Sequence, residues 1–295
     1  MPDPTPAHPH RVALTVAYDG ADFHGWQRQD LALAPGQTPD DLNLAAARYR
    51  VEGDTVVLRT VQDELERGLR DLLREPVTVL GASRTDAGVH ADGQCAAFTT
   101  EPGPDTGVGW PLDRGLDRLV KALNAKLPGD LLVRDARAVP IGLDPISQAI
   151  EKQYTYSIHT GPQRPLWDRR FVFWSVPDLD EHAMHTAAQH LVGEHDFTSF
   201  AQINHGRQST VRTVFACGVT RDTDTRVRIT VRGGGFLYNM VRIIAGTLVE
   251  VGRQKMQADE VPAVLAAADR TRAGPTLPPE GLCLDWVRYG EQAEP

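Results

Sequence analysis

The sequence predicts an α+β protein built from two similar halves, and two observations support this fold class. Segments with alternating apolar residues and segments with apolar residues at helical spacing follow one another in the order strand, helix, strand, strand, helix, strand. The same six-element order occurs again in the second part of the chain, with one helix added. This is the order of the ferredoxin-like βαββαβ arrangement. We therefore expect two ferredoxin-like halves joined around a central cleft.

The first half contains four expected strands and two expected helices. Thr60 and Asp63 are placed to form a capping box, which predicts the start of the first helix, and Glu75-Pro76 ends it. The second helix carries apolar residues at helical spacing and ends at Pro128-Gly129. The expected strands span residues 11–18, 77–82, 93–100 and 131–139, and the apolar face of the second helix consists of Leu116, Leu119, Val120 and Leu123.

The second half begins within residues 139–150, where Pro140, Gly142 and Pro145 indicate a boundary. Its expected strands span 153–159, 211–220, 225–231 and 282–289, and its expected helices span 180–192, 236–251 and 262–268. The domain division predicted from these patterns has a disordered tail at 1–10, halves at 11–140 and 141–290, and a second tail at 291–295.

The bulk properties predict a cytoplasmic protein with a substantial core. The chain has 295 residues, of which 41% are hydrophobic. Its first ten residues, MPDPTPAHPH, carry neither a cationic start nor an apolar run. Nowhere does the sequence approach the roughly 18 consecutive apolar residues that a membrane span needs. We therefore expect no membrane association.

The cysteines and histidines do not predict a metal site. Cys95, Cys217 and Cys283 are far apart and form no C-x-x-C pair, so we expect them to be packing residues. His182 and His185 lie one helical turn apart, which fits either a metal site or a solvated helix face. The solvated face is favoured, because a zinc site needs three or four converging ligands.

The net charge of −8 argues against a protein that binds nucleic acid over its whole surface. Between Asn204 and Lys255, however, nine basic residues stand against three acidic ones, a local excess of six positive charges. Such a segment fits a local RNA contact, and it equally fits arginines that point outward from ordinary strands. The RNA interpretation predicts an affinity that falls steeply with added salt.

The segment Gly81 to Phe98 joins two expected strands and is the strongest candidate for a functional loop. It carries Arg84, Asp86 and His90 among small residues that let the backbone approach a ligand closely. Loops held by a rigid scaffold often carry catalytic residues. An Asp beside an Arg in a turn is also commonly just a solvated ion pair, so the loop alone leaves both interpretations open.

Several segments resemble the tRNA pseudouridine synthase A family, in the same order along the chain. They are RTDAGVHA followed by GQ, YDGADFHGWQRQ, LNAKLP, LVGEHDFTSF, MVRIIAG and EGLCL. Six separated matches in order are far more specific than one short motif. The likeness runs from about Val12 to about Tyr289, but residues 30–54 depart from the family pattern and are expected to be a surface insertion.

The resemblance implies a tRNA pseudouridine(38-40) synthase, an isomerase that converts uridine to pseudouridine at tRNA positions 38, 39 and 40 of the anticodon stem-loop. Asp86 would act as nucleophile or base. A nucleophilic carboxylate must stay ionised, which a nearby cation favours. Arg242 is the candidate cation, because its apolar neighbours leave little solvent-facing surface; the alternative is an Arg that extends to the surface. The resemblance gives the same pair.

The remaining site residues take their roles from the resemblance. Arg84 would help to extrude the target base, or would merely pair with Asp86. Tyr154 and Tyr156 share one face of a strand, which is commonly a core pair, but the family places Tyr154 against the flipped uracil. Leu282 or Leu284 would close the other side of the pocket.

The reaction needs no cofactor, because it involves no redox change and no external energy. The implied partner is the anticodon arm of tRNA, and the family acts as a homodimer. Two other function classes stay open: an N-glycoside hydrolase that uses Asp86 would release free uracil, and a non-catalytic RNA-binding module would tolerate Asp86→Asn.

Overall fold

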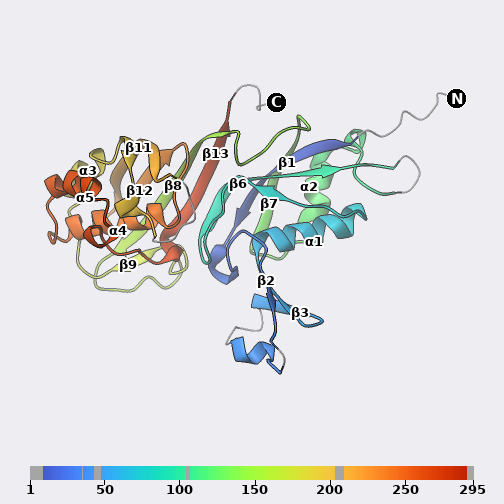
Figure 1. Cartoon of the computed structure of the whole chain (residues 1–295), viewed down its shortest axis with the longest axis horizontal. Helices are drawn as coiled ribbons and strands as arrows, with labels where there is room; N and C mark the ends of the chain where they lie inside the picture. Colours follow the sequence, from blue (N-terminus) through green and yellow to red (C-terminus); the bar gives the residue numbers. More distant parts are fainter. Residues whose placement is uncertain (1–8, 35, 43–47, 104–106, 203–208, 291–295) are drawn as a thin grey trace. The chain divides into compact units, whose positions relative to one another are not determined.

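The protein is described by a computed structural model, which describes residues 9–34, 36–42, 48–103, 107–202 and 209–290. Residues 1–8 and 291–295, where tails were expected, therefore lie outside the described residues. The chain divides into two compact units, which are described separately: unit 1 consists of residues 1–149 and 289–295, and unit 2 of residues 150–288. As expected, both units combine strands with helices (Figure 1).

Unit 1 has the predicted order of strand, helix, strand, strand, helix, strand. Its elements are β1 (His10–Tyr18), α1 (Val61–Leu73), β5 (Leu80–Gly81), β6 (His90–Thr100), α2 (Leu116–Asn124) and β7 (Leu131–Val139). The central strand β1 pairs antiparallel with both β6 and β7, and β5 pairs with the outer side of β6. The two helices pack against each other, where Gly68 of α1 meets the side chains of Leu123 and Leu127.

The Thr60 cap is present, since its hydroxyl accepts a hydrogen bond from the Asp63 N–H at 3.3 Å. The strand expected over 77–82 is shorter than predicted, and α1 explains the difference. The Val77 carbonyl accepts bonds from Arg70, and the Val79 N–H donates to Glu66 Oε1 at 3.0 Å. Because α1 side chains satisfy this backbone, only Leu80–Gly81 pairs with a neighbouring strand.

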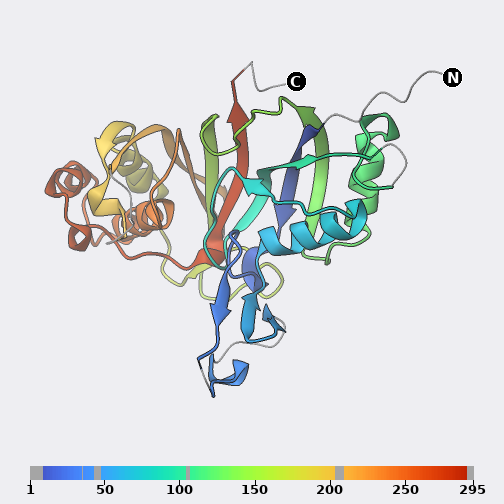
Figure 2. The same ribbon diagram turned by 45° about the vertical axis from the view of Figure 1, so that its right-hand side comes forward.

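The insertion after β1 forms a small antiparallel sheet. Its strands are β2 (Asp30–Ala32), β3 (Tyr49–Glu52) and β4 (Thr55–Leu58), in the order β2, β4, β3. Figure 2 shows that this sheet projects away from the helices and main sheet of unit 1. An ion pair between Arg50 of β3 and Asp63 of α1 connects this sheet to the helix, and the Asp63 side chain is fully buried. The sequence predicted an insertion here, but not a sheet.

Unit 2 contains the second set of six elements and three more. They are β8 (Ala149–Thr160), β9 (Phe173–Ser175), α3 (Glu181–Gln189), β10 (Gly193–Asp196), β11 (Val211–Thr223), β12 (Arg226–Gly233), α4 (Met240–Gly252), α5 (Val261–Ala267) and β13 (Leu282–Tyr289). The strand order is β10, β11, β12, β8, β13, with β9 parallel to β8. β9 and β10 were not predicted; each is only three or four residues long.

Helix α4 begins four residues later than the sequence predicted. Asn239, directly before it, has φ of 61°, a left-handed conformation that prevents a continuous helix from residue 236. From Met240 onward the helix is almost wholly buried, as expected from its apolar sequence. No helix of the described residues is long and apolar enough to cross a membrane.

Candidate active site

Asp86 and Arg84 lie in the loop between β5 and β6 of unit 1. The Asp86 side chain is half-buried, whereas Arg84 is exposed. The Val89 N–H donates to the Asp86 carbonyl at 3.1 Å and closes a turn in which Gly88 has φ of +82°. The sequence expectation of a tight loop carrying both residues is therefore confirmed.

The residue before Asp86 is held by the segment that follows β1. The Trp26 N–H donates to the Thr85 carbonyl at 3.0 Å, and the Thr85 hydroxyl lies 2.7 Å from the Tyr18 hydroxyl. Gly25 has φ of +90°, and a Cβ atom there would lie 2.7 Å from the Thr85 carbonyl oxygen and 3.1 Å from the Asp86 carbonyl carbon. Only glycine permits this close approach.

The residues after Asp86 are held by the same segment. The Gly88 N–H donates to the Phe23 carbonyl at 3.3 Å, and the Gly20 N–H donates to His90 Nδ1 at 3.0 Å. His90 also lies 3.2 Å from the Asp19 carboxylate, which caps the short turn at Gly20. His90 therefore helps to position the loop.

A fully buried glutamine fixes the start of the loop. Gln94 of β6 accepts a hydrogen bond from the Ser83 N–H at 3.1 Å and donates one to the Ser83 carbonyl at 2.6 Å. With the Thr85 and Gly88 contacts, this fixes backbone on both sides of Asp86. The loop is thus preorganised, a property that catalysis by a single positioned group requires.

Tyr154 and Tyr156 lie on the buried face of β8 in unit 2, as their spacing predicted. The Tyr154 ring meets Phe236 edge to face, with centroids 5.4 Å apart. Tyr156 is completely buried, and its hydroxyl donates to the Pro278 carbonyl at 2.7 Å. Burial raises the pKa of Tyr156, and nearby Glu280 raises it further while Arg242 lowers it. Tyr156 is therefore a neutral structural residue.

Arg242 lies in the first turn of α4, and hydrogen bonds to Leu277 and Asn239 hold its side chain. Its Nε donates to the Leu277 carbonyl at 2.7 Å, and its Nη1 donates to Asn239 Oδ1 at 2.7 Å. The Leu277 N–H in turn donates to the Arg242 carbonyl at 3.3 Å. The side chain is only half-buried, and its guanidinium orientation is fixed by these bonds.

The segment from Leu277 to Leu282 links Arg242 to the start of β13. Tyr156 bonds the Pro278 carbonyl, and Gly281 packs so closely on the Tyr156 ring that a Cβ atom would lie 2.6 Å from it. Leu282 follows directly and is 5% exposed. Arg242, Tyr156 and Gly281 thus place Leu282, and the sequence did not reveal the parts played by Tyr156 and Gly281.

The structure shows Arg84 and Asp86 within one loop of unit 1, and Tyr154, Arg242 and Leu282 within unit 2. The Asp86–Arg242 pair joins residues of different units and stays a prediction. The described residues contain no group of three or more His, Cys, Asp or Glu side chains able to hold a metal ion.

The arginine-rich segment has many acidic partners within unit 2. The partners of its arginines include carboxylates outside the segment, as in Arg226 with Asp168 and Arg221 with Glu181. The other ion pairs are Arg221 with Asp178, Arg228 with Asp222, Arg232 with Glu151, and Arg253 and Lys255 with Glu250. Four of these carboxylates, Asp168, Asp178, Glu181 and Glu151, lie outside the segment and offset part of its six excess positive charges, which counting within the segment could not show. The steep salt dependence stays a prediction.

Comparison with known proteins identifies similar chains over nearly the full length. A family model described as tRNA pseudouridine synthase matches residues 187–290. The tRNA pseudouridine synthase A of Geotalea uraniireducens is 40% identical over 281 residues, covering 95% of this chain and 99% of that protein. The enzymes of that name from Bacillus subtilis and Ruminiclostridium cellulolyticum are 38% and 36% identical, with the same coverage.

Among solved structures, an H/ACA ribonucleoprotein bound to a substrate RNA containing 2'-deoxyuridine matches at a TM-score of 0.31 with 13% identity. The match covers 91% of this chain, which spans 59% of the length of that one. So low a similarity adds nothing to the argument.

Proposed function

Because the chain belongs to the tRNA pseudouridine synthase A family, we propose that it isomerises uridine to pseudouridine in the anticodon stem-loop of tRNA. In this reaction the N-glycosidic bond breaks, the uracil turns, and its C5 joins the same sugar carbon; the C5 proton leaves to solvent and N1 takes up a proton. The observation that carries the proposal is the Asp86 loop, whose backbone is fixed on both sides of one carboxylate.

Asp86 is the proposed catalytic group. Its carboxylate would attack the sugar or the base to form an adduct, or would remove a proton from the sugar. Each role requires the ionised form. The half-buried position disfavours that form, so a nearby cation would be needed to stabilise it. The bond that the Asp86 carbonyl accepts from the Val89 N–H fixes the backbone of this residue.

Arg242 is the proposed cation that keeps Asp86 ionised. An anion beside a guanidinium is stabilised, and the desolvation penalty of a half-buried Arg is offset by such a partner. The bonds to Leu277 and Asn239 support this role, because they orient the guanidinium before any substrate binds.

Tyr154 and Leu282 are the proposed uracil contacts. Phe236 fixes the orientation of the Tyr154 ring edge to face, and because Tyr154 is only 6% exposed, the uracil would stack on the small part of the ring that stays accessible. Leu282 would contact the base by its apolar side chain. The exposed Arg84 would occupy the place of the extruded nucleotide or hold its phosphate.

The location of the enzyme, its oligomeric state, its cofactor requirement and its target positions belong to the same proposal. We propose that the enzyme works in the cytoplasm as a homodimer, needs no cofactor and modifies tRNA positions 38, 39 and 40, as the resemblance implies. A digest of tRNA from cells lacking the enzyme, mapped for pseudouridine, would identify the sites; loss of pseudouridine elsewhere only would contradict this assignment.

Tritium release from tRNA labelled at uridine C5 tests the activity. An isomerase releases the label into water, because C5 loses its hydrogen when it bonds the sugar. An N-glycoside hydrolase would instead yield labelled free uracil, and an RNA-binding module would release neither. Labelled water together with pseudouridine in the digested tRNA is the expected result; labelled uracil or no release would contradict the proposal.

A further inference from the structure

The loop of residues 161–172, which joins β8 to β9 in unit 2, carries the most exposed large hydrophobic side chain of the described residues. Trp167 is 91% exposed, and Leu166 and Phe171 beside it are 58% and 46% exposed. A large apolar side chain left in water loses the stabilisation that its burial would give. A tryptophan left in water within an apolar cluster is therefore a strong indication of a binding surface.

The loop is well anchored, so Trp167 does not owe its exposure to a lack of local structure. At the ends of the loop, the Gly161 carbonyl accepts a bond from Trp174 Nε1 at 2.9 Å, and the Gly161 N–H donates to the Ser175 carbonyl at 3.2 Å. In its middle, Asp168 next to Trp167 forms an ion pair with Arg226 of β12. The scaffold holds the tryptophan outward.

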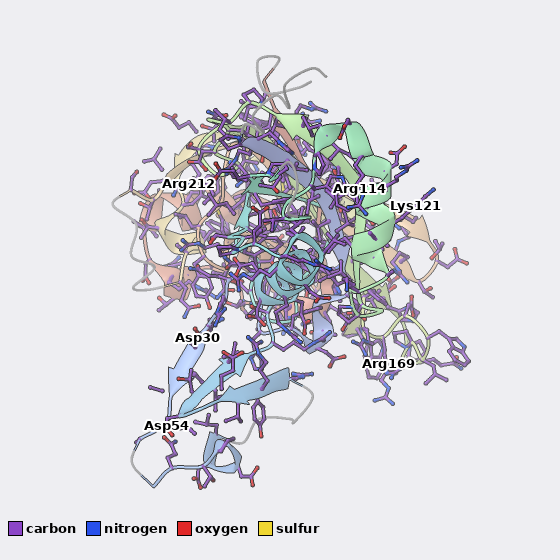
Figure 3. All side chains as sticks on the ribbon, turned by 90° about the vertical axis from the view of Figure 1, so that its right-hand side faces the viewer. Asp30, Asp54, Arg114, Lys121, Arg169 and Arg212 are labelled. Atoms are coloured by element: carbon purple, nitrogen blue, oxygen red, sulfur yellow. The ribbon has the colours of Figure 1, made fainter. Side chains whose placement is uncertain are left out.

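Two arginines flank Trp167 and remain available to an anion. Arg164 and Arg169 are both exposed, and neither forms an ion pair with a carboxylate in the part of the chain that the structure describes. Arg169, labelled in Figure 3, extends outward, and its Nη1 donates to the Leu166 carbonyl at 2.8 Å. The contrast with the 204–255 segment is clear, because many of the arginines there already pair with carboxylates.

We propose that Trp167, with Arg164 and Arg169, binds an unpaired nucleotide of the substrate RNA, the tryptophan stacking on its base and the arginines meeting its phosphates. Aromatic rings beside cations are the usual platform for unpaired bases. The two exposed cations favour RNA over a second copy of this acidic chain. The proposal rests on the proposed function, because it takes tRNA as the ligand.

The nucleotide bound here differs from the one that is isomerised. Asp168, next to Trp167, pairs with Arg226, which the strand register places opposite His159 of β8. Tyr154 lies five residues away along the same strand, roughly 17 Å of extended chain, whereas neighbouring stacked nucleotides lie only a few ångströms apart. Trp167 therefore contributes affinity and placement of the tRNA, and does not take part in the chemistry.

The test compares wild type with Trp167→Ala, Trp167→Phe and Trp167→Leu in the full-length protein. Binding of unmodified tRNA and the rate of pseudouridine formation at saturating tRNA are measured for each. Trp167→Ala should weaken binding by about 5- to 150-fold, which corresponds to the roughly 1 to 3 kcal/mol of one stacked base. Trp167→Phe keeps a ring and should bind better than Trp167→Leu, while the saturated rate stays unchanged.

Arg164→Gln provides an independent readout, since no side chain in the described structure depends on it. Loss of one phosphate contact should reduce the slope of log affinity against log salt by about 1. An unchanged slope would contradict the phosphate contact.

Light scattering of the same Trp167 variants separates RNA binding from assembly. A Trp167→Ala protein that binds tRNA with wild-type affinity would overturn the proposal. A Trp167→Ala protein whose oligomeric state changes, while Trp167→Leu keeps the wild-type state, would also overturn it and would indicate that Trp167 contacts a second copy of the chain. A wild-type protein that forms no pseudouridine would instead refute the proposed function.

Discussion

Replacing Gly25 with alanine would move the catalytic loop without altering any catalytic side chain. Gly25 has φ of +90°, and the new Cβ would lie 2.7 Å from the Thr85 carbonyl oxygen, about 0.7 Å closer than the 3.4 Å at which ordinary contact begins. Because this carbonyl belongs to the peptide that leads into Asp86, the loop must shift by a similar amount. A misplacement of about 1 Å can cost 100-fold in rate. We expect pseudouridine formation to slow by about 10- to 100-fold.

Gly115 offers a matched control for the cost of the backbone conformation. Its φ is +86°, nearly that of Gly25, yet nothing lies within 4 Å of an added Cβ. Both variants should lose about 1 to 3 kcal/mol of unfolding free energy through backbone strain at a positive φ. Only Gly25→Ala also displaces the Asp86 loop, so only its rate should fall.

Single-turnover pseudouridine formation, tRNA affinity and urea unfolding together decide the outcome. The expected pattern is a slow Gly25→Ala enzyme with normal tRNA affinity, and a Gly115→Ala enzyme that is destabilised but reacts at the normal rate. A normal rate in Gly25→Ala would refute the argument that close backbone packing positions Asp86. Equal rate losses in both variants would attribute the effect to instability alone.

Three further changes test other parts of the structure. Tyr156→Phe leaves the Pro278 carbonyl without its partner and should lower the unfolding free energy by about 1 to 3 kcal/mol in urea titrations, whereas an unchanged midpoint would show that the bond is dispensable. Arg50→Ala removes the main partner of the buried Asp63 carboxylate and should cost roughly 3 kcal/mol in the same assay. A loss below the error would show that the second partner of Asp63, Arg28 at 3.5 Å, is enough to stabilise it. Burial, and to a lesser degree a nearby arginine, lowers the pKa of His24 below its usual 6.5. The unfolded chain therefore binds the proton more readily than the folded protein does, and the unfolding free energy should fall as the pH drops below about 6.5. His24→Gln should flatten this dependence between about pH 7 and 5, and an unaltered pH profile would contradict the assignment.

The sequence predicted the order of the six repeated elements in each unit because their apolar periodicities are strong. The strand at 131–139 and the strand at 282–289 have the expected bounds. Two of the failures depend on details that apolar periodicity does not report. Residues 77–79 fit a strand pattern, but their backbone is satisfied by Arg70 and Glu66 of α1. Helix α4 starts late because Asn239 takes a left-handed conformation.

Some features of the candidate site could be predicted from local sequence patterns, and others could not. RTDAG identifies the loop, and the spacing of Tyr154 and Tyr156 places both on one face of β8. That His90 bonds the Gly20 N–H, or that Gly281 exists to fit the Tyr156 ring, depends on contacts between segments 70 and 125 residues apart. Local sequence patterns do not predict such contacts, and for the same reason they did not predict the acidic partners of the arginines.

The measurement that bears most directly on the mechanism is tritium release by Asp86→Asn from tRNA labelled at uridine C5. Asparagine keeps the size and the loop contacts of aspartate but cannot act as a nucleophile or base. We predict that this variant binds tRNA as wild type does and releases no label above background. Release at the wild-type rate would contradict the assignment of Asp86 as the catalytic carboxylate.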